Sequence, residues 1–399
     1  MADIRSYMQE REKRERKQAG YKQKIIRHKL AAVYRILLVV AAIAAAAALV
    51  YVQYRRHVYT AYDVIASAAR ESAGGATDVR LGNAVLTYSK DGAHCTDAKG
   101  TVTWNQTYEI QDARISVCGS TVAIGDYNGR SIYVQNAEKQ LGEISTNMPI
   151  RNVAVAADGT VTAILADTDI TWVNTYSAGG DLLYKGQTHM DDAGYPVAIS
   201  LSPGGELLCV SYVYVDAGVL KTNVVFYNFG PVGENNSDFI VSAYAYTDML
   251  IPCVQFMNDT TAFAVGDNRL TIYAGKQKPM EKAQYNFDRE VQAVYYSESY
   301  IGLVFRAESG DEGLYTMEVY NAAADKLGSF AIDMEYTDIF FQDNSFVVYN
   351  ETQCRIMTLE GLEKFNGTFS KAVRLLLPAS GAYKYIAVTD DSIDTIQLR

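Results

Sequence analysis

The sequence of 399 residues is poor in the residues that build catalytic and metal centres. Its four histidines stand apart, at no spacing that metal ligands use. The metalloprotease, nucleotide-binding and serine-hydrolase motifs H-E-x-x-H, G-x-x-x-x-G-K-[ST] and G-x-S-x-G are absent from it. We therefore expect no catalytic residues, no metal and no cofactor.

Cysteine is also scarce and shows no pairing pattern. The five cysteines lie far apart without a C-x-x-C motif, at Cys95, Cys118, Cys209, Cys253 and Cys354. Exported domains usually use cysteines in pairs, as disulfides. An odd and scattered set favours reduced residues in the core, with a single disulfide as the alternative.

Only one long apolar run exists, which excludes a protein with many membrane spans. Seventeen residues from Ile36 to Val52 form this run, and arginines stand on both sides of it. They rise roughly 25 Å as a helix, and the flanking residues extend it towards the thickness of a bilayer core. We predict a membrane-spanning helix over residues 31–54. A buried helix of a soluble protein is the alternative.

The basic residues predict the orientation of this helix. Residues 1–35 contain eleven Lys/Arg and four acidic residues, whereas three Lys/Arg occur in the eighteen residues after the apolar run. The positive-inside rule then places residues 1–30 in the cytoplasm as a basic arm and exports residues 57–399. We expect a single-pass protein of the plasma membrane. A cleaved signal peptide is disfavoured, because its basic region would be about 35 residues long.

The exported part lacks positive charge. Residues 57–399 contain 23 basic and 42 acidic residues. Such a body repels phosphate backbones, so a nucleic-acid partner is excluded.

Helical periodicity disappears after residue 70, and short runs of Val, Ile, Tyr, Phe and Thr take its place. Turn dipeptides such as Gly82-Asn83, Asn128-Gly129 and Asp343-Asn344 separate these runs at intervals of about 8–12 residues. Four predicted strands recur every 35–55 residues, about eight times in all. This arithmetic predicts an all-β fold, a β-propeller of seven to eight four-stranded blades.

The last repeat contains only three predicted strands before the chain ends. A blade with one strand missing would expose unpaired backbone groups. The remaining β-like segment is Val58–Ile65, so we predict that residues 57–66 close the last blade. We expect some of the following side chains to become buried there: Tyr62, Val64, Ile65, Ile396 and Leu398.

The stretch TYSKDGAHCTDAKGTVTWNQTYEIQ (residues 87–111), with Trp104-Asn105-Gln106-Thr107 as its most specific part, resembles a bacterial family. This family consists of Gram-positive single-pass membrane proteins, defined as a domain of unknown function, with a WD40- or quinoprotein-like repeat body. The resemblance extends from the basic arm to the last strand. It implies the propeller architecture and carries over no catalytic residues.

Candidate binding residues come from the fourth repeat, where two insertions lengthen the loops. Residues 213–220 and 230–238 form these insertions, and loops of this kind often carry function. The predicted contact residues are Tyr212, Tyr214, Asp216, Asn235 and Asn236. The acidic pairs Asp167/Asp169, Asp191/Asp192, Asp311/Glu312 and Asp390/Asp391 are interpreted as turn residues, because Asp is favoured in turns.

These observations favour a non-enzymatic binding, scaffold or sensing module, tethered to the membrane outside the cytoplasm. Its partners would be the lipid bilayer, through residues 31–54, and an envelope protein or glycan. The alternative is a quinoprotein-like or glycan-active enzyme with its site at the central channel. The predicted inner strands, such as VAVAA and AISLS, are apolar, which disfavours that alternative.

Overall fold

The structure of the protein is a computed structural model that describes residues 2–70, 74–166, 170–189, 194–247, 249–308, 310 and 312–399. It consists of two compact units, Met1–Val58 and Tyr59–Arg399. Each unit is described by itself.

The first unit is one helix, α1 (Ala2–Arg56). Within it, Val33–Gln53 is long and apolar enough to cross a membrane, and none of it is buried in the protein. These 21 residues rise about 32 Å. A segment of this length and composition fits a membrane anchor and equally the apolar part of a signal sequence.

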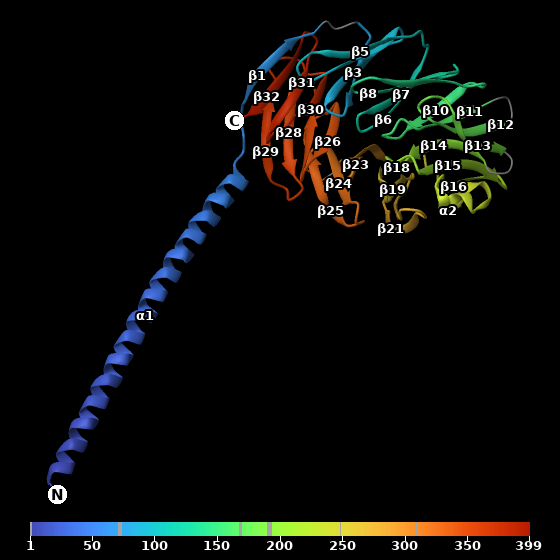
Figure 1. The fold of residues 1–399 in the computed structure, drawn as a ribbon. Coiled ribbons are helices and arrows are strands. Elements are labelled where there is room, and N and C mark those ends of the chain that lie inside the picture. Colours follow the sequence, from blue (N-terminus) through green and yellow to red (C-terminus); the bar gives the residue numbers. More distant parts are fainter. Residues whose placement is uncertain are drawn as a thin grey trace. The chain divides into compact units, whose positions relative to one another are not determined.

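The strands of the second unit form eight four-stranded antiparallel sheets in the described residues, arranged as the blades of a propeller (Figure 1). The first strands of neighbouring blades contact one another, so they are the inner strands of the ring. The predicted all-β propeller is confirmed, and the number of blades is eight.

Blades 1 to 4 contain, from the inner to the outer strand, β2 (Thr77–Leu81), β3 (Ala84–Tyr88), β4 (Gly92–Thr96) and β5 (Val102–Thr107); β6 (Ala113–Cys118), β7 (Thr121–Asp126), β8 (Ser131–Asn136) and β9 (Gln140–Ser145); β10 (Ile150–Val155), β11 (Val161–Ala166), β12 (Ile170–Tyr176) and β13 (Leu182–His189); β14 (Tyr195–Leu201), β15 (Leu207–Asp216), β16 (Val219–Asn228) and β17 (Ile240–Tyr246). The connection from β16 to β17 holds a short helix, α2 (Pro231–Glu234), and a 3-10 turn, η1 (Ser237–Phe239).

Blades 5 to 8 contain, in the same order, β18 (Cys253–Asn258), β19 (Thr261–Val265), β20 (Arg269–Ala274) and β21 (Met280–Asn286); β22 (Val291–Tyr296), β23 (Tyr300–Arg306), β24 (Tyr315–Asn321) and β25 (Lys326–Ile332); β26 (Asp338–Gln342), β27 (Ser345–Tyr349), β28 (Gln353–Thr358) and β29 (Glu363–Thr368); β30 (Leu375–Pro378), β31 (Lys384–Val388), β32 (Ser392–Leu398) and β1 (Tyr62–Ala69).

The predicted turn residues adopt the backbone conformation that made them turn signals. Gly82 has a φ of +62° between β2 and β3, and Asn128 has a φ of 66° between β7 and β8. A side chain at Gly82 would also approach Ser120 of the next blade to 3.2 Å. Tight reversals of this kind connect antiparallel strands and fix their register.

The hydrophobic core lies between the blades. Each cluster of buried side chains combines residues of two neighbouring blades, so every joint of the ring has a core of its own. Between blades 4 and 5, for example, the rings of Phe226 and Tyr273 pack edge to face with their centroids 4.9 Å apart. Apolar burial at the joints therefore holds the ring together.

The fourth strand of blade 8 comes from the other end of the chain. β1 pairs with β32 from Tyr62 opposite Leu398 to Ala69 opposite Ser392, and Figure 1 shows the blue strand beside the red one. The strand begins four residues later than the predicted Val58–Ile65. Tyr59 instead forms an isolated parallel bridge with Phe365 of blade 7.

Some of the side chains predicted to become buried at this closure are buried. Ile396 and Leu398 of β32 are buried, at 3% and 4% exposure. Val64 and Ile65 of β1 are about half exposed, because β1 is the outermost strand and the register shifts between Val64 and Ala66.

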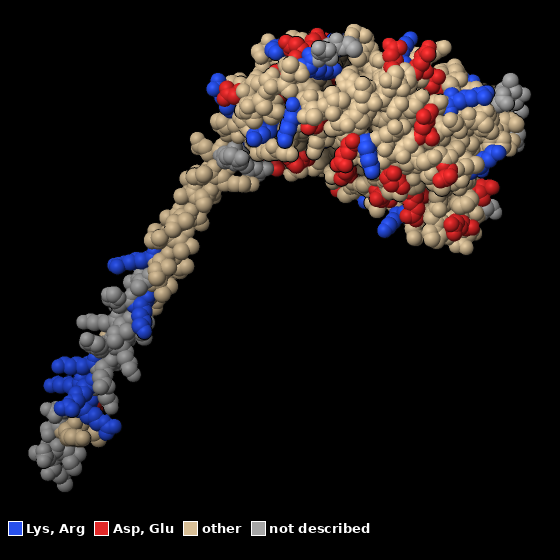
Figure 2. Space-filling model, turned by 45° about the horizontal axis from the view of Figure 1, so that its top comes forward, with Lys and Arg blue, Asp and Glu red and all other residues tan. Residues whose placement is uncertain are grey.

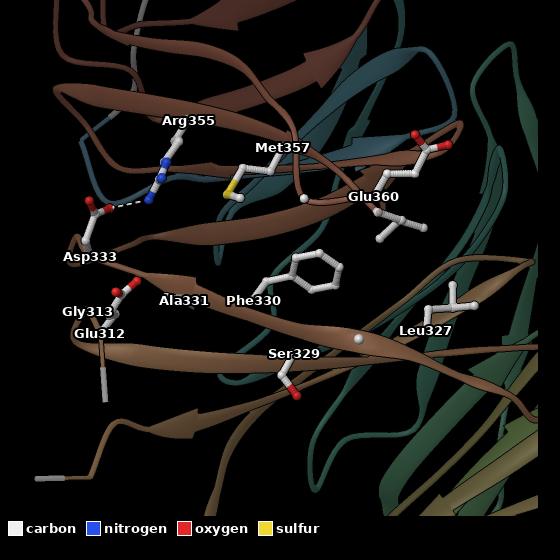
Figure 3. Close-up of a pocket in the computed structure, with 13 residues that line it drawn as sticks. Glu312, Gly313, Leu327, Ser329, Phe330, Ala331, Asp333, Arg355, Met357 and Glu360 are labelled. Atoms are coloured by element: carbon white, nitrogen blue, oxygen red, sulfur yellow. Dashed lines mark hydrogen bonds and ion pairs between the residues drawn. The ribbon is translucent and has the colours of Figure 1, made fainter. Parts of the chain in front are cut away.

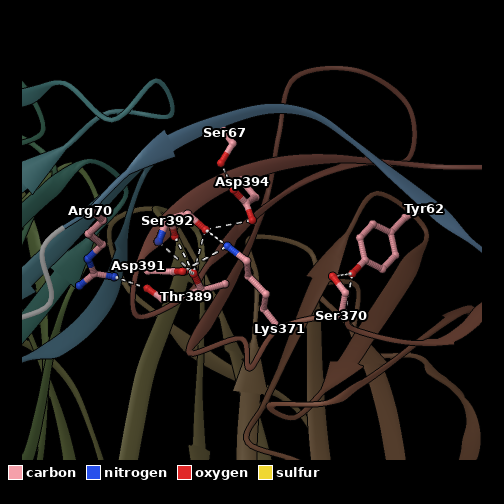
Figure 4. Close-up of polar contacts among 9 residues, drawn as sticks. All are labelled: Tyr62, Ser67, Arg70, Ser370, Lys371, Thr389, Asp391, Ser392 and Asp394. Carbon is pink, nitrogen blue, oxygen red and sulfur yellow. Dashed lines mark hydrogen bonds and ion pairs between the residues drawn. The ribbon is translucent and has the colours of Figure 1, made fainter.

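Polar contacts fasten the same strand (Figure 4). Arg70, directly after β1, forms a buried ion pair with Asp78 of blade 1, with 2.5 Å between Nη2 and Oδ1. Ser67 of β1 donates to the Asp394 carboxylate at 2.5 Å. These contacts tie β1 both to its own blade and to the blade where the ring begins.

Candidate binding surfaces

The five predicted contact residues all belong to blade 4, but they lie at two different ends of it. Tyr212, Tyr214 and Asp216 are on β15, whose hairpin turn lies at the start of β16. Asn235 and Asn236 follow α2, after the end of β16. The ten residues of β16 span about 33 Å. The structure therefore does not bring these residues together into one site.

Tyr212 is not available to a partner. Its side chain is 2% exposed, and its hydroxyl shares a hydrogen bond with the Tyr227 hydroxyl at 2.8 Å. Burial raises the pKa of Tyr212 well above its usual range. The prediction that Tyr212 is a contact residue is wrong, because it faces the core between blades 3 and 4.

Asn235 and Asn236 are exposed, and their side chains serve the local fold. Their amide nitrogens donate to the carbonyl oxygens of Pro231 and Val232 at 2.7 Å and 3.0 Å. These carbonyls belong to the short helix α2, so both asparagines complete its hydrogen bonding. The two residues hold the insertion in shape.

The hairpin between β15 and β16 projects beyond its sheet. β14 pairs with β15 only as far as Val213, and β17 pairs with β16 only from Thr222. Residues 214–221 thus form a two-stranded ribbon that has no neighbouring strand on either side among the described residues. Its turn, Ala217-Gly218, has positive φ at both positions, as in the tightest hairpins.

The end of this ribbon is apolar. Val215, Val219 and Leu220 are 69%, 51% and 46% exposed. Asp216 and Lys221 form an ion pair beside them, with 2.6 Å between Oδ2 and Nζ. We call residues 214–221 the blade-4 hairpin. The predicted contact residues Tyr214 and Asp216 belong to this hairpin, whereas its aliphatic residues were not predicted, although three of them flank an Ala-Gly turn in the sequence.

The inner strands of blades 2 to 6 surround a cavity of about 450 Å³ in the central channel. Two serines on its wall have structural partners. Ser116 Oγ accepts the Val155 amide at 3.1 Å, and Ser200 Oγ accepts the Phe256 amide at 2.9 Å. Each of these bonds joins two blades, so the hydroxyls stabilise the ring.

The Cys118 thiol on the channel wall is held in its protonated form. Burial, with Asp259, Asp158 and Glu298 adding to it, raises the pKa of the Cys118 thiol. A thiol with a raised pKa is a poor nucleophile, since the thiolate is the reactive form.

The predicted inner segments are apolar, but the inner strands extend further and include arginines near their starts. Arg114 and Arg151 begin the inner strands of blades 2 and 3, and both guanidinium groups lie over the ring of Tyr127, at 4.6 Å and 5.5 Å. Arg114 also pairs with Asp112 at 3.2 Å. Both arginines thus have partners within the protein, in cation–π contacts and hydrogen bonds.

The cysteines and the acidic pairs were predicted to be structural. All five cysteines are free, three of them buried and two half-buried, which confirms the prediction of reduced residues. Asp390 and Asp391 lie in the turn from β31 to β32, as predicted, where the Thr389 hydroxyl donates to Asp391 at 2.8 Å. Asp167, Asp169, Asp191, Asp192 and Asp311 lie outside the described residues.

Trp104, in the stretch that carried the family resemblance, joins two blades. It lies on β5 and packs into the core between blades 1 and 2. Its indole nitrogen donates to the carbonyl oxygen of Asn136 at 2.6 Å.

Comparison with protein families adds one assignment. Residues 55–398 match the family described as "Family of unknown function (DUF5711)". The chain belongs to the DUF5711 family. This confirms the predicted resemblance to a domain of unknown function with a propeller body. The DUF5711 match starts at Arg55, so residues 1–54 lie outside it, although the resemblance was expected to include them.

Solved propellers resemble this DUF5711 protein in fold. Chaetomium thermophilum Sqt1, solved bound to the N-terminus of the ribosomal protein L10, has 12% identity and a TM-score of 0.53, covering 85% of this chain and 100% of that one. BamB from Moraxella catarrhalis has 11% identity and a TM-score of 0.49, covering 84% and 100%. At these identities the similarity is one of fold. No curated protein matches the sequence significantly.

Proposed function

We propose that this DUF5711 protein is a membrane-tethered propeller that binds another protein outside the cytoplasm. The apolar segment Val33–Gln53 supports the tether. The charge supports the orientation, because basic residues concentrate in the arm before that segment, whereas acidic residues prevail on the propeller (Figure 2). In this proposal residues 31–54 cross the plasma membrane, residues 1–30 remain in the cytoplasm, and the propeller serves as a scaffold or sensing module.

The blade-4 hairpin carries this proposal. The exposed Val215 and Leu220 lie opposite each other on one face of this ribbon, and the exposed Val219 lies on the other face, opposite Asp216. Among the described residues, no further strand pairs with either edge of the ribbon. Exposed aliphatic side chains gathered at one place typically mark an interaction surface. The Asp216–Lys221 ion pair beside them gives the surface a polar rim, as protein interfaces have.

A protein fits this surface better than a glycan. Burial of aliphatic side chains against other apolar groups lowers the free energy of the complex, whereas sugars present mainly hydroxyls. The Sqt1 structure is that of a propeller bound to a segment of another protein, which agrees with a protein partner here.

An enzyme with its site at the central channel is the competing proposal. The channel serines that bond to neighbouring blades, and a Cys118 thiol whose pKa is raised, both argue against nucleophilic catalysis there. Binding at the blade-4 hairpin is therefore the better supported function.

Photo-crosslinking in living cells tests the docking surface. A photoreactive phenylalanine analogue at Val219 is expected to give one discrete adduct, and the same analogue at Val102, a matched exposed valine on β5 of blade 1, is expected to give none. The change of Val215 and Leu220 to Ser should abolish the adduct at position 219. Equal labelling at both positions, or an adduct that survives the double change, would contradict the proposal.

Protease accessibility tests the orientation. Protease added to intact cells without their wall is expected to remove the propeller and to leave a basic membrane fragment of residues 1 to about 55. A propeller that is protected in intact cells and digested only after lysis would overturn the proposed topology.

A further inference from the structure

A groove between the outer parts of blades 6 and 7 has a chemistry different from that of the blade-4 hairpin. Its volume is about 690 Å³, and it is lined on one side by β25 and on the other by β28 and the turn that follows it. It lies at the rim of the propeller, since β25 is the outermost strand of blade 6.

The middle of this groove is apolar and its ends are acidic (Figure 3). Phe330 and Met357 face each other at the centre. Glu312 and Asp333 lie at one end, and Glu360 lies at the other.

The balance of charge around the groove is negative. Arg355 is the basic residue among the residues that line it, and it is engaged by two carboxylates, those of Asp333 and Glu363, each at 2.7 Å. The lining residues thus contain three carboxylates, those of Glu312, Asp333 and Glu360, and one guanidinium group. A basic ligand is therefore favoured over an acidic one.

The wall formed by β25 also offers backbone hydrogen-bonding groups. β25 pairs with β24 on one side, and no strand of the described residues pairs with its other edge. Gly328, Ser329 and Ala331 are small, so they leave this edge uncovered along the groove. Exposed edges of this kind accept an extended segment as an additional strand.

We infer that the groove binds an extended segment of a partner protein, with apolar side chains at its centre and a Lys or Arg at each end. The segment adds to the free edge of β25. Alternate side chains enter the groove, because successive side chains of a strand point to opposite sides. Six residues separate Leu327 from Asp333 along β25, about 20 Å, so the two basic residues of the segment stand six positions apart.

A designed peptide serves as the probe. The sequence TRTVKVTRT places Arg, Val, Val and Arg on one side of a strand. Its rearranged counterpart TVTRKRTVT has the same composition but places Val, Arg, Arg and Val on that side. Fluorescence anisotropy with the whole chain in a neutral detergent is expected to show saturable binding of the first peptide, and binding of the second at least fivefold weaker.

Charge reversal locates the site. Glu312→Lys together with Glu360→Lys is expected to weaken binding of TRTVKVTRT at least tenfold. Glu109→Lys together with Glu138→Lys changes the net charge equally at exposed positions outside the groove and should alter binding less than twofold. Hydrogen exchange should slow in residues 326–332 when the peptide binds, because the edge amides become hydrogen bonded.

Three results would overturn the inference. The first is no binding of TRTVKVTRT at 1 mM peptide, and the second is equal binding of the two peptides. The third is an equal loss of affinity for TRTVKVTRT in the Glu312/Glu360 double variant and in the Glu109/Glu138 double variant. This site is independent of the blade-4 hairpin: the change of Val215 and Leu220 to Ser should leave peptide binding unchanged, so the two proposals fail separately.

Discussion

Two joints of the same ring are built in different ways. Between blades 4 and 5, fourteen buried apolar residues form the core, among them Phe226, Phe256 and Tyr273. Between blades 8 and 1, where the ring closes, the core has six buried residues, all of them aliphatic. Because hydrophobic stabilisation grows with the apolar area removed from water, the closing joint gains less from packing.

The closing joint relies on strand pairing and on buried polar contacts instead. β1 pairs with β32 along its whole length, and Arg70 carries the contact on to Asp78 and Thr87 of blade 1. Oδ2 of Asp78 is buried and has no hydrogen-bond partner among the described residues. A ring can thus be closed with little hydrophobic core if a strand from the other end of the chain completes the last blade.

Removal of the closing strand should have the largest effect. A soluble form beginning at Glu71 lacks β1 and Arg70, whereas one beginning at His57 retains both. The shorter form exposes the edge of β32 and leaves Asp78 without its arginine. We expect its thermal unfolding midpoint to be lower by more than about 10 °C, or its cooperative transition to be lost. Midpoints within two degrees of each other would contradict the closure of the ring by β1.

A large-to-small substitution should lower the free energy of unfolding by different amounts at the two joints. Phe226→Ala, at the joint of blades 4 and 5, is expected to lower the free energy of unfolding by about 3–5 kcal/mol. Ile386→Ala, at the closing joint, is expected to cost about 2 kcal/mol, because a thin core collapses more easily around a cavity. Urea unfolding measures both values, and a larger loss for Ile386→Ala would reverse the comparison.

Breaking the buried Arg70–Asp78 ion pair should lower the free energy of unfolding by more than a single contact suggests. Arg70→Ala leaves the Asp78 carboxylate buried without a cation and should cost on the order of 3 kcal/mol. Adding Asp78→Ala should recover part of this loss, because the unpaired charge is then gone. A double change that is as unstable as the sum of the single changes would show that the two residues act independently.

Acid should weaken the closing joint first. His94, near Arg70 and Asp78, has a pKa lowered from 6.5, chiefly by burial and then by Arg70. Its unfolded form therefore takes up a proton before the folded form does, and stability is lost as the pH falls below about 6.5. We expect the melting temperature of His94→Gln to fall less than that of the wild type between pH 7 and 5. Parallel curves for the two proteins would contradict this assignment.

Alkali should weaken the joint of blades 4 and 5 by a similarly small amount. Burial raises the pKa of Tyr246 above its usual 10.0, and its hydroxyl contacts Tyr273 at 2.6 Å. The unfolded form loses the phenolic proton first, so stability should fall as the pH rises above about 10. Tyr246→Phe is expected to show a smaller fall between pH 9 and 11. An equal fall would assign the alkaline sensitivity to other groups.

Local patterns in the sequence predicted much of this fold, because each blade repeats its own turn chemistry. Gly82 and Asn128 mark reversals whatever surrounds them. The outer strands are harder to predict: β21, for example, is polar and largely exposed, so little alternation of apolar residues remains. The closing strand was placed four residues early, since residues 58–61 have the composition of a strand, whereas in the structure Tyr59 forms an isolated bridge with Phe365 of blade 7 and pairing with β32 starts at Tyr62.

The candidate sites were harder to predict, because they depend on contacts between distant residues. The sequence alone does not show which face of β15 carries Tyr212. In the structure, the register of β15 with β16 places the Tyr212 side chain in the core between blades 3 and 4. The groove of blades 6 and 7 combines residues about 30 positions apart that share no motif. The aliphatic tip of the blade-4 hairpin was visible in the sequence but was passed over in favour of polar residues.

Native-state hydrogen exchange of the whole chain tests most directly the claim that the ring is closed by β1 at its weakest joint. The amides of β1 and β32 are expected to exchange through an opening at least tenfold more frequent than that of β15 and β16, a difference of about 1.4 kcal/mol. Equal protection of the two pairs, or faster exchange in β15 and β16, would contradict it.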